Sequence, residues 1–361
     1  MRFRMVWAAV LSLAVLACGS PGSAPQQAAS PSPAEKGELW TALQATSKMK
    51  VLSGRRDQPT QATIDLPAGT GPHITTFSPD GRYAYVGGMG NGDLDVLRAD
   101  ARQVVATLHL GPAGTHQVKP SPDGSVLLAA QVATQTLVKL AADVAHERWS
   151  VAGSLSFAQL GRAPVCTIFR DDGRRAYVSL NPSGLAIVDV AAMQLVDVLP
   201  VAGFIACGMV KAADGRSVTI ASSGGGGHVY RLDTATDRLD DLGALGAPDW
   251  HSFNMTADGK LGVGSVPGGD EVLLVDLTGG QARTAAVLAL HPTPGVATDQ
   301  PDAIGIRGGT AWVSLRKSGK LAVIDLVKRA VVTYLDLAPP ADSINPANCA
   351  GCALHGVTVR S

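Results

Sequence analysis

Charge of one sign, aromatic rings and long apolar runs are all scarce in this chain of 361 residues. Basic and acidic side chains balance at 30 each, and aromatic residues make up only 4% of the chain. A nucleic-acid-binding protein needs a basic patch or stripe, so this balance argues against that class. No apolar stripe repeats with the period of a helix, which argues against an all-helical fold.

The first residues have the features of a targeting segment. Arg2 and Arg4 give a basic start, and Met5 to Ala17 form an apolar run too short to span a bilayer. The run ends on Val15-Leu16-Ala17-Cys18, which resembles the lipobox of bacterial lipoproteins. The resemblance implies that residues 1–17 are a signal peptide and that Cys18 carries the lipid. An ordinary secretory signal with a chance cysteine is the alternative.

Residues 18–37 are rich in Ser, Pro, Ala and Gln and lack apolar periodicity, so we expect a flexible tether before a folded part at 38–361. Without Arg2 and Arg4 the mature chain stays close to neutral. We expect a lipid-anchored, extracytoplasmic protein of the cell envelope. Gly19 in place of Asp after the cysteine suggests the outer membrane if the organism is Gram-negative.

One pattern recurs at intervals of about forty to fifty residues, the range expected for propeller blades. It is clearest in "PHITTFSPDGRYAYVGG" and returns in "THQVKPSPDGSVLLAAQ", "VCTIFRDDGRRAYVSL", "ACGMVKAADGRSVTIAS", "WHSFNMTADGKLGVGSV" and, more weakly, "PDAIGIRGGTAWVSL". Each copy predicts a strand, a turn and a second strand. The Asp-Gly pairs, such as Asp80-Gly81, predict two-residue hairpins in which both central residues have positive φ.

A third and a fourth strand follow each hairpin, as in "LAVIDL" and "RAVVTYLDL". First strands begin at seven places: His73, His116, about Cys166, Cys207, His251, Asp302 and His355. The seventh copy has only "HGVTVRS", and its missing strands are supplied by "ELWTALQ", "KMKVLSG" and "QATIDLP" near the other terminus. The sequence therefore predicts an all-β, seven-bladed β-propeller of four-stranded antiparallel blades, with the last blade closed by N- and C-terminal strands.

The repeats resemble those of the YVTN-type seven-bladed β-propellers. Pro72-His73, Ser78-Pro79-Asp80-Gly81 and Tyr85-Val86 match that pattern in the first copy, and Ser121-Pro122-Asp123-Gly124 matches it in the second. The resemblance covers nearly the whole chain after the tether. It implies the fold and leaves the function open, since such propellers serve as binding platforms, as haem d1 domains of nitrite reductases and as a few lyases.

Residues at the start of the innermost strands should converge at one mouth of the central channel. Half of the chain's eight histidines fall at this repeat position, together with two cysteines and an aspartate. Imidazole and thiolate are ligands that copper, zinc and iron favour. We therefore predict a metal site drawn from His73, His116, His251, His355, Cys166 and Cys207, with Asp302 as a ligand-binding residue. A polar, water-filled channel without a metal is the alternative, and histidines in such a funnel also suit proton transfer.

The cysteines allow a second interpretation, because an oxidising compartment favours disulfides. Cys166 and Cys207 lie on neighbouring inner strands and could form a disulfide instead of binding metal. Cys349 and Cys352 form either a local disulfide or a pair of metal ligands before the last strand. Ala353 stands where a c-type haem motif requires His, so that motif is excluded.

No catalytic constellation emerges from the sequence, so catalysis is left open. The leading hypothesis is a ligand-binding propeller, with a membrane anchor and a channel mouth that takes a transition metal, for example copper, or a metallocofactor. An oxidoreductase of haem d1-like or copper type, or a lyase using the same funnel, is the second hypothesis. A scaffold that binds a protein partner on one face is the third.

Overall fold

The computed structural model describes residues 34–360, apart from 206, 291–292, 295–296 and 340–352. The signal peptide, Cys18, most of the predicted tether, Cys349 and Cys352 lie outside this part. Strand β1 begins at Ala34, four residues before the expected start of the folded part. Among the described residues, no helix has the length and apolar character needed to cross a membrane.

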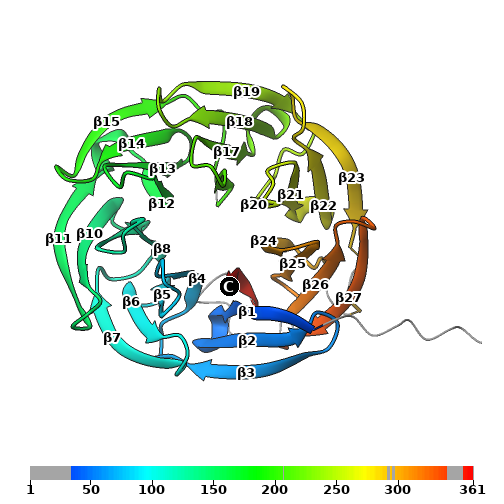
Figure 1. Cartoon of the computed structure of the whole chain (residues 1–361), viewed down its shortest axis with the longest axis horizontal. Coiled ribbons are helices and arrows are strands. Elements are labelled where there is room, and N and C mark those ends of the chain that lie inside the picture. Colours follow the sequence, from blue (N-terminus) through cyan, green and yellow to red (C-terminus); the bar gives the residue numbers. More distant parts are fainter. Residues whose placement is uncertain (1–33, 206, 291–292, 295–296, 340–352, 361) are drawn as a thin grey trace, which may run out of the picture. The chain divides into compact units, whose positions relative to one another are not determined.

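Seven four-stranded antiparallel sheets form a ring, as predicted (Figure 1). From the innermost strand outward, the first three blades after the closing blade are β4 (Pro72–Phe77), β5 (Tyr83–Gly88), β6 (Asp93–Arg98) and β7 (Gln103–His109); β8 (Thr115–Pro120), β9 (Val126–Gln131), β10 (Thr136–Asp143) and β11 (Arg148–Ser156); and β12 (Ala163–Phe169), β13 (Arg175–Asn181), β14 (Leu185–Asp189) and β15 (Gln194–Leu199).

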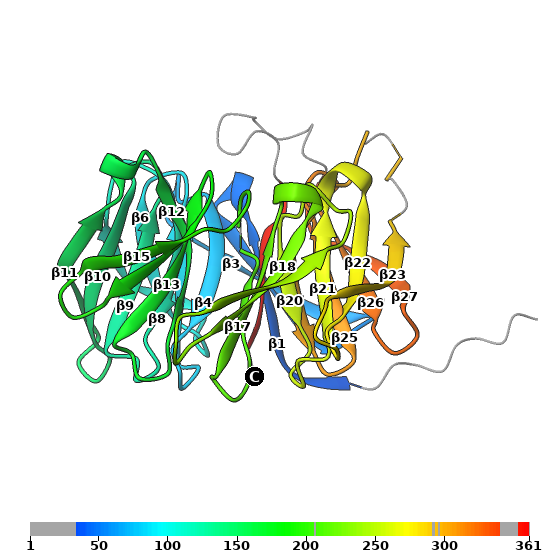
Figure 2. The ribbon, with the colours of Figure 1, turned by 90° about the horizontal axis from the view of Figure 1, so that it is seen from above.

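The next three blades are β16 (Met209–Lys211), β17 (Ser217–Ser222), β18 (His228–Asp233) and β19 (Leu239–Ala244); β20 (Phe253–Met255), β21 (Leu261–Val266), β22 (Glu271–Asp276) and β23 (Arg283–Ala289); and β24 (Pro301–Arg307), β25 (Thr310–Leu315), β26 (Lys320–Asp325) and β27 (Ala330–Asp336). Helical structure is confined to 3-10 turns at Gln44–Thr46, Ala158–Leu160, Gly224–Gly226 and Pro267–Gly269. In the side view the inner strands run along the axis of the ring (Figure 2).

The closing blade combines strands from both ends of the described chain, in the predicted order. Strand β28 (His355–Arg360) is innermost and pairs with β1 (Ala34–Leu43), which is followed by β2 (Lys48–Arg55) and β3 (Pro59–Asp65). Glu38 on β1 receives hydrogen bonds from Arg360 on β28 at 3.2 Å and from Arg102 of the next blade at 2.7 Å. The closure therefore connects the last strand to the first complete blade as well as to β1.

Alternation along the strands explains how the blades pack face to face. On β5, Tyr83 and Tyr85 pack against the following blade, whereas Ala84 and Val86 pack against the preceding one. Both faces of such a strand are buried, and each of the seven interfaces between neighbouring blades has its own apolar cluster. The core is thus a ring of inter-blade layers around an axial channel.

The Asp-Gly turns differ from the two-residue hairpins that the sequence suggested. The N–H of Gly81 donates to the Ser78 carbonyl at 2.8 Å, so Pro79 and Asp80 are the central residues, and only Gly81 of the Asp-Gly pair has positive φ. The Asp80 carboxylate accepts from the Ser78 hydroxyl at 2.6 Å and from the Arg82 N–H at 3.1 Å. Aspartate is therefore used because its side chain holds the turn together, and proline because its φ suits the second turn position.

We expect deletion of residues 355–361 to lower the thermal midpoint by roughly 10 °C or more, or to abolish cooperative unfolding. The deletion removes β28 and exposes the edge of β1 and the apolar cluster that contains Val357. Differential scanning calorimetry of the truncated and full chains measures the effect, with deletion of Ser361 alone as control. An unchanged midpoint in the longer deletion would contradict the role assigned to β28.

Candidate functional site

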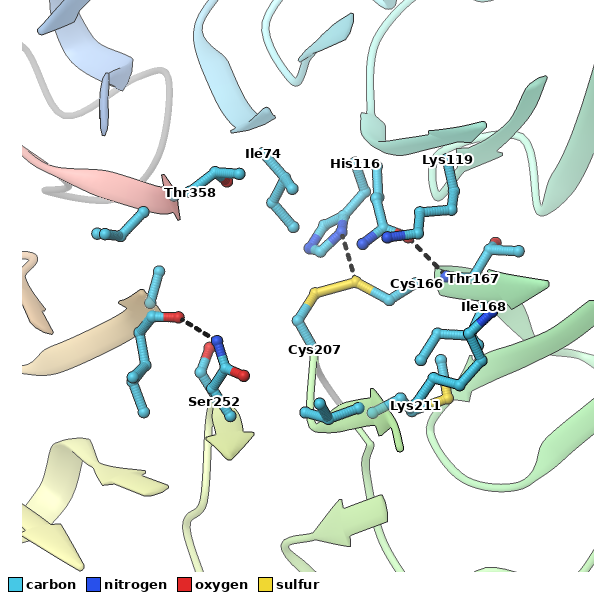
Figure 3. A pocket seen from close by; sticks show the side chains of 18 of the residues that line it. Ile74, His116, Lys119, Cys166, Thr167, Ile168, Cys207, Lys211, Ser252 and Thr358 are labelled. Carbon is cyan, nitrogen blue, oxygen red and sulfur yellow. Dashed lines mark hydrogen bonds between the residues drawn. A yellow bond between two sulfur atoms is a disulfide. The ribbon is translucent and has the colours of Figure 1, made fainter. Parts of the chain in front are cut away.

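The residues at the starts of the inner strands meet in a ring, which we call the axial ring: His73, His116, Cys166, Cys207, His251, Asp302 and His355. On one side, His73 Nε2 lies 3.0 Å from His116 Nε2, and His116 Nδ1 lies 3.8 Å from Cys166 Sγ. Cys166 is joined to Cys207 by a disulfide, which Figure 3 shows beside His116. Four neighbouring blades are linked in this way.

The other side of the axial ring is centred on a buried carboxylate. Asp302 has no exposed side-chain area; its Oδ1 lies 2.6 Å from His251 Nδ1 and its Oδ2 lies 2.8 Å from His355 Nε2. The His355 ring stacks on His73, with centroids 3.6 Å apart. Next to His251, Ser252 forms an isolated bridge with Cys207, which completes the circle.

The four histidines do not share a single point, so the predicted metal site divides into two groups of donors. His116, Cys166 and Cys207 form one group, and His251, Asp302 and His355 form the other; within each group the donor atoms lie within 4.8 Å of one another. His73 belongs to neither group. Its Nδ1 lies 2.9 Å from Gln44 Oε1, so both of its ring nitrogens already have protein partners.

The disulfide bears on the roles predicted for Cys166 and Cys207. It joins inner strands of neighbouring blades, one of the two alternatives that the sequence left open. As a disulfide the pair offers no thiolate, which is the form of cysteine that binds metal. Metal ligation by these two residues therefore stays a prediction for the reduced protein only, and the axial ring of the oxidised protein presents imidazole and carboxylate donors.

Buried serines hold the start of several inner strands, and the sequence reasoning missed them. Ser179, Ser265 and Ser314 on the second strands accept the backbone N–H of Cys166, Ser252 and Ala303, each at 3.0 Å. In the blades of Cys166 and Ala303 the pairing register shifts at this point, and such a bulge re-aims the next side chain. The recurring serine in "AYVSL", "LGVGSV" and "AWVSL" was the available sequence signal.

Gly356 brings the closing strand into the axial ring. Its φ is +32°, and a Cβ there would lie 2.0 Å from the backbone oxygen of His73. Only glycine allows β28 to approach β4 this closely. The Gly356 N–H also donates to His355 Nδ1 at 2.8 Å. An acceptor nitrogen carries no proton, so neutral His355 holds its proton on Nε2, facing Asp302.

Burial dominates the electrostatics of the axial ring. It lowers the pKa of His116 to about 3 and, with the neighbouring imidazoles, lowers the pKa of His73 well below its usual range. Burial also lowers the pKa of His355, against the opposing effect of Asp302. For Asp302, burial raises the pKa, but His251 and His355 together outweigh it and hold the pKa well below the ordinary value. An ionised carboxylate thus sits among imidazoles that stay neutral.

Asp302 lacks well-aligned hydrogen bonds despite its short contacts. The two histidine nitrogens approach its oxygens at ion-pair distance, yet neither carboxylate oxygen nor His251 Nδ1 has a hydrogen bond of acceptable angle among the described residues. A buried charge without such bonds is unfavourable unless a cation or a proton neutralises it. The group formed by His251, Asp302 and His355 is therefore the part of the axial ring best suited to hold a cation.

A cavity of about 520 Å³ opens onto the axial ring. His116, His251 and His355 line its inner end, and it extends along the channel to Pro79 and Pro122 in the turns after β4 and β8. Its walls come from the inner strands, and Figure 3 shows side chains from both sides turned toward the space between them. The volume suits a small organic molecule.

No protein-family model matches the chain, and no curated protein matches it. Solved structures share the fold. Hydrazine synthase of Kuenenia stuttgartiensis is 15% identical over 76% of this chain and 89% of that chain, with a TM-score of 0.61. The dihydro-haem d1 dehydrogenase NirN is 20% identical over 84% and 74%, with a TM-score of 0.58. A functionally unknown protein from Desulfotomaculum acetoxidans is 13% identical over 90% and 99%, with a TM-score of 0.61. At these identities the similarity shows the β-propeller fold alone.

The buried imidazoles predict a pH-dependent stability. The unfolded chain binds protons on His73, His116 and His355 below about pH 6.5, whereas the folded protein does not until a lower pH, so stability is full above this value and falls as pH decreases. We expect the unfolding free energy, measured with urea and a chelator, to fall between about pH 7 and pH 5, and His116→Gln to reduce the slope by about one proton. Equal slopes in the two proteins would show that His116 titrates normally.

Proposed function

We propose that this chain is a lipid-anchored, extracytoplasmic β-propeller that binds a small ligand in its axial cavity, with a transition-metal ion held by His251, Asp302 and His355. The buried Asp302 carboxylate, which contacts two imidazoles without an aligned hydrogen bond, is the observation that carries the proposal. Two imidazoles and one carboxylate are a common donor set for a transition metal with open positions. Because His251 and His355 also line the cavity, the open positions would face a bound ligand.

The donor set fits a metal ion on condition that His355 loses its Nε2 proton. The hydrogen bond from Gly356 to Nδ1 places that proton on the nitrogen that faces Asp302. A metal must displace it, so its affinity should increase with pH. The low pKa of His355, caused mainly by burial, keeps the ring neutral and limits the displacement to a single proton. When bound, the ion would supply Lewis-acid or redox chemistry to a ligand in the cavity.

The same hydrogen bond favours a second candidate, an enzyme that transfers protons without a metal. Asp302 contacts the proton-bearing Nε2 of His355, and His251 shares the carboxylate while 27% of its side chain is exposed. A histidine held in one tautomer beside a carboxylate is suited to acid–base catalysis. A lyase using this funnel would rely on that arrangement.

A haem d1-like oxidoreductase is another form of the enzyme hypothesis. It draws support from the solved dihydro-haem d1 dehydrogenase NirN, a protein of the same fold described in complex with DHE. Since the similarity concerns the fold, the argument for this chain rests on its own histidines. A coloured purified protein would favour a haem or type 1 copper centre, and a colourless one without metal would favour a scaffold for a protein partner.

We expect protein purified from its native compartment to contain about one equivalent of a transition metal, and His251→Gln to lose most of it, because a three-donor site with one donor removed binds metal much more weakly. Elemental analysis by mass spectrometry measures the content. His109→Gln, an exposed histidine paired with Asp93, is the matched control and should retain the metal. Equal content in wild type and His251→Gln, or none in the wild type, would exclude this metal site and leave the proton-transfer candidate.

The lipid anchor rests on Cys18, which lies outside the described residues. We expect Cys18→Ser to move the protein from the membrane fraction to the soluble fraction, because the lipobox cysteine is the acylated residue. Fractionation followed by immunoblotting measures this, and Ser20→Ala serves as control. A Cys18→Ser protein that stays with the membranes would refute the lipobox interpretation.

A further inference from the structure

Lys119 places an unpaired cation in the wall of the axial cavity. It lies on β8, three residues after His116, and lines the cavity in Figure 3. No carboxylate or other acceptor among the described residues pairs with its Nζ. Burial and the nearby charge of Lys211 both lower the pKa of Lys119, and no hydrogen bond opposes them.

The corresponding residues of other inner strands behave differently. Thr76, Asn254 and Thr358 stand at the same repeat position, and each donates to a backbone oxygen of an adjacent blade: Thr76 to Val118, Asn254 to Ile304 at 3.0 Å, and Thr358 to Thr75 at 2.6 Å. These side chains tie the blades together. Lys119 makes no such bond, so its ammonium group remains available to the cavity.

Further donors on the same wall lack a matching anion. Lys211 on β16 lines the cavity, but its Nζ pairs with Asp171 and also lies 3.5 Å from the Phe169 carbonyl oxygen. Gln117 Oε1 accepts the Thr167 N–H at 2.7 Å, so the amide hydrogens of Gln117 are its remaining donors, and no described acceptor takes them. Two like charges near one another are mutually destabilising until a negative group lies between them.

The rest of the wall is largely apolar, with Ile74, Phe77, Met209, Phe253, Ile304 and Val357. We propose that the cavity takes an organic anion whose sulfonate, carboxylate or phosphate group binds Lys119 and whose apolar body packs against these side chains. The ligand would lie between this cationic wall and the axial ring. The proposal shares the cavity of the proposed function but needs no metal.

A pair of fluorescent probes tests the charge requirement. Anilinonaphthalenesulfonate is an organic anion, and N-phenylnaphthylamine is its neutral analogue without the sulfonate. We expect one anionic probe per protein, weakened by about tenfold or more in Lys119→Met, because a charge-assisted hydrogen bond is lost. Binding of the neutral probe should be unchanged, and Lys119→Arg should retain the anionic probe. Decanoate should displace that probe, whereas inorganic phosphate, which has no apolar body, should not.

Lys320→Met is the matched control, since Lys320 forms an ion pair with Asp336 on the outer strands. The melting temperature of Lys119→Met should equal or exceed that of the wild type, because the substitution removes a desolvated and unpaired charge. Equal affinity of the wild type for the two probes, or equal weakening of both by Lys119→Met, would overturn the proposal. Metal content, measured in parallel, should not change in Lys119→Met, so this test and that of the proposed metal site can fail separately.

Discussion

The pairing of β28 with β1 is the constraint on which the rest of the molecule depends. Without it the seventh blade has no inner strand, and the apolar cluster between that blade and its neighbour opens to solvent. The same strand supplies His355, and Gly356 brings it within contact of His73. Closure of the fold and completion of the axial ring are therefore one event, because both depend on the same six residues.

The channel separates opposite charges along its length. Asp302 lies at the axial ring, surrounded by neutral imidazoles, whereas Lys119 and Lys211 lie along the cavity wall toward the turns. Water is largely excluded from both places, so each charge acts more strongly than it would at the surface. A ligand that carries a negative group and reaches the axial ring would complement both ends, and this polarity would fix its orientation.

The repeat pattern carried most of the fold, since Pro72-His73 and the Ser-Pro-Asp-Gly turns mark each blade independently of tertiary contacts. It failed in detail at Asp80-Gly81, where the aspartate side chain closes a longer turn. The pattern also placed the candidate site residues at one repeat position. It could not show how they pair, because His251, Asp302 and His355 come from three different blades and meet only when all blades are packed.

The sequence by itself determined the number of blades, the strand order of the closing blade and the repeat position from which the axial ring is built, because these follow from local strand and turn chemistry repeated along the chain. Only the tertiary structure decided that Cys166 joins Cys207, that Asp302 lies between two imidazoles and that Lys119 faces the cavity without a partner. These contacts depend on register shifts and inter-blade packing, which bring together residues that lie far apart in the chain.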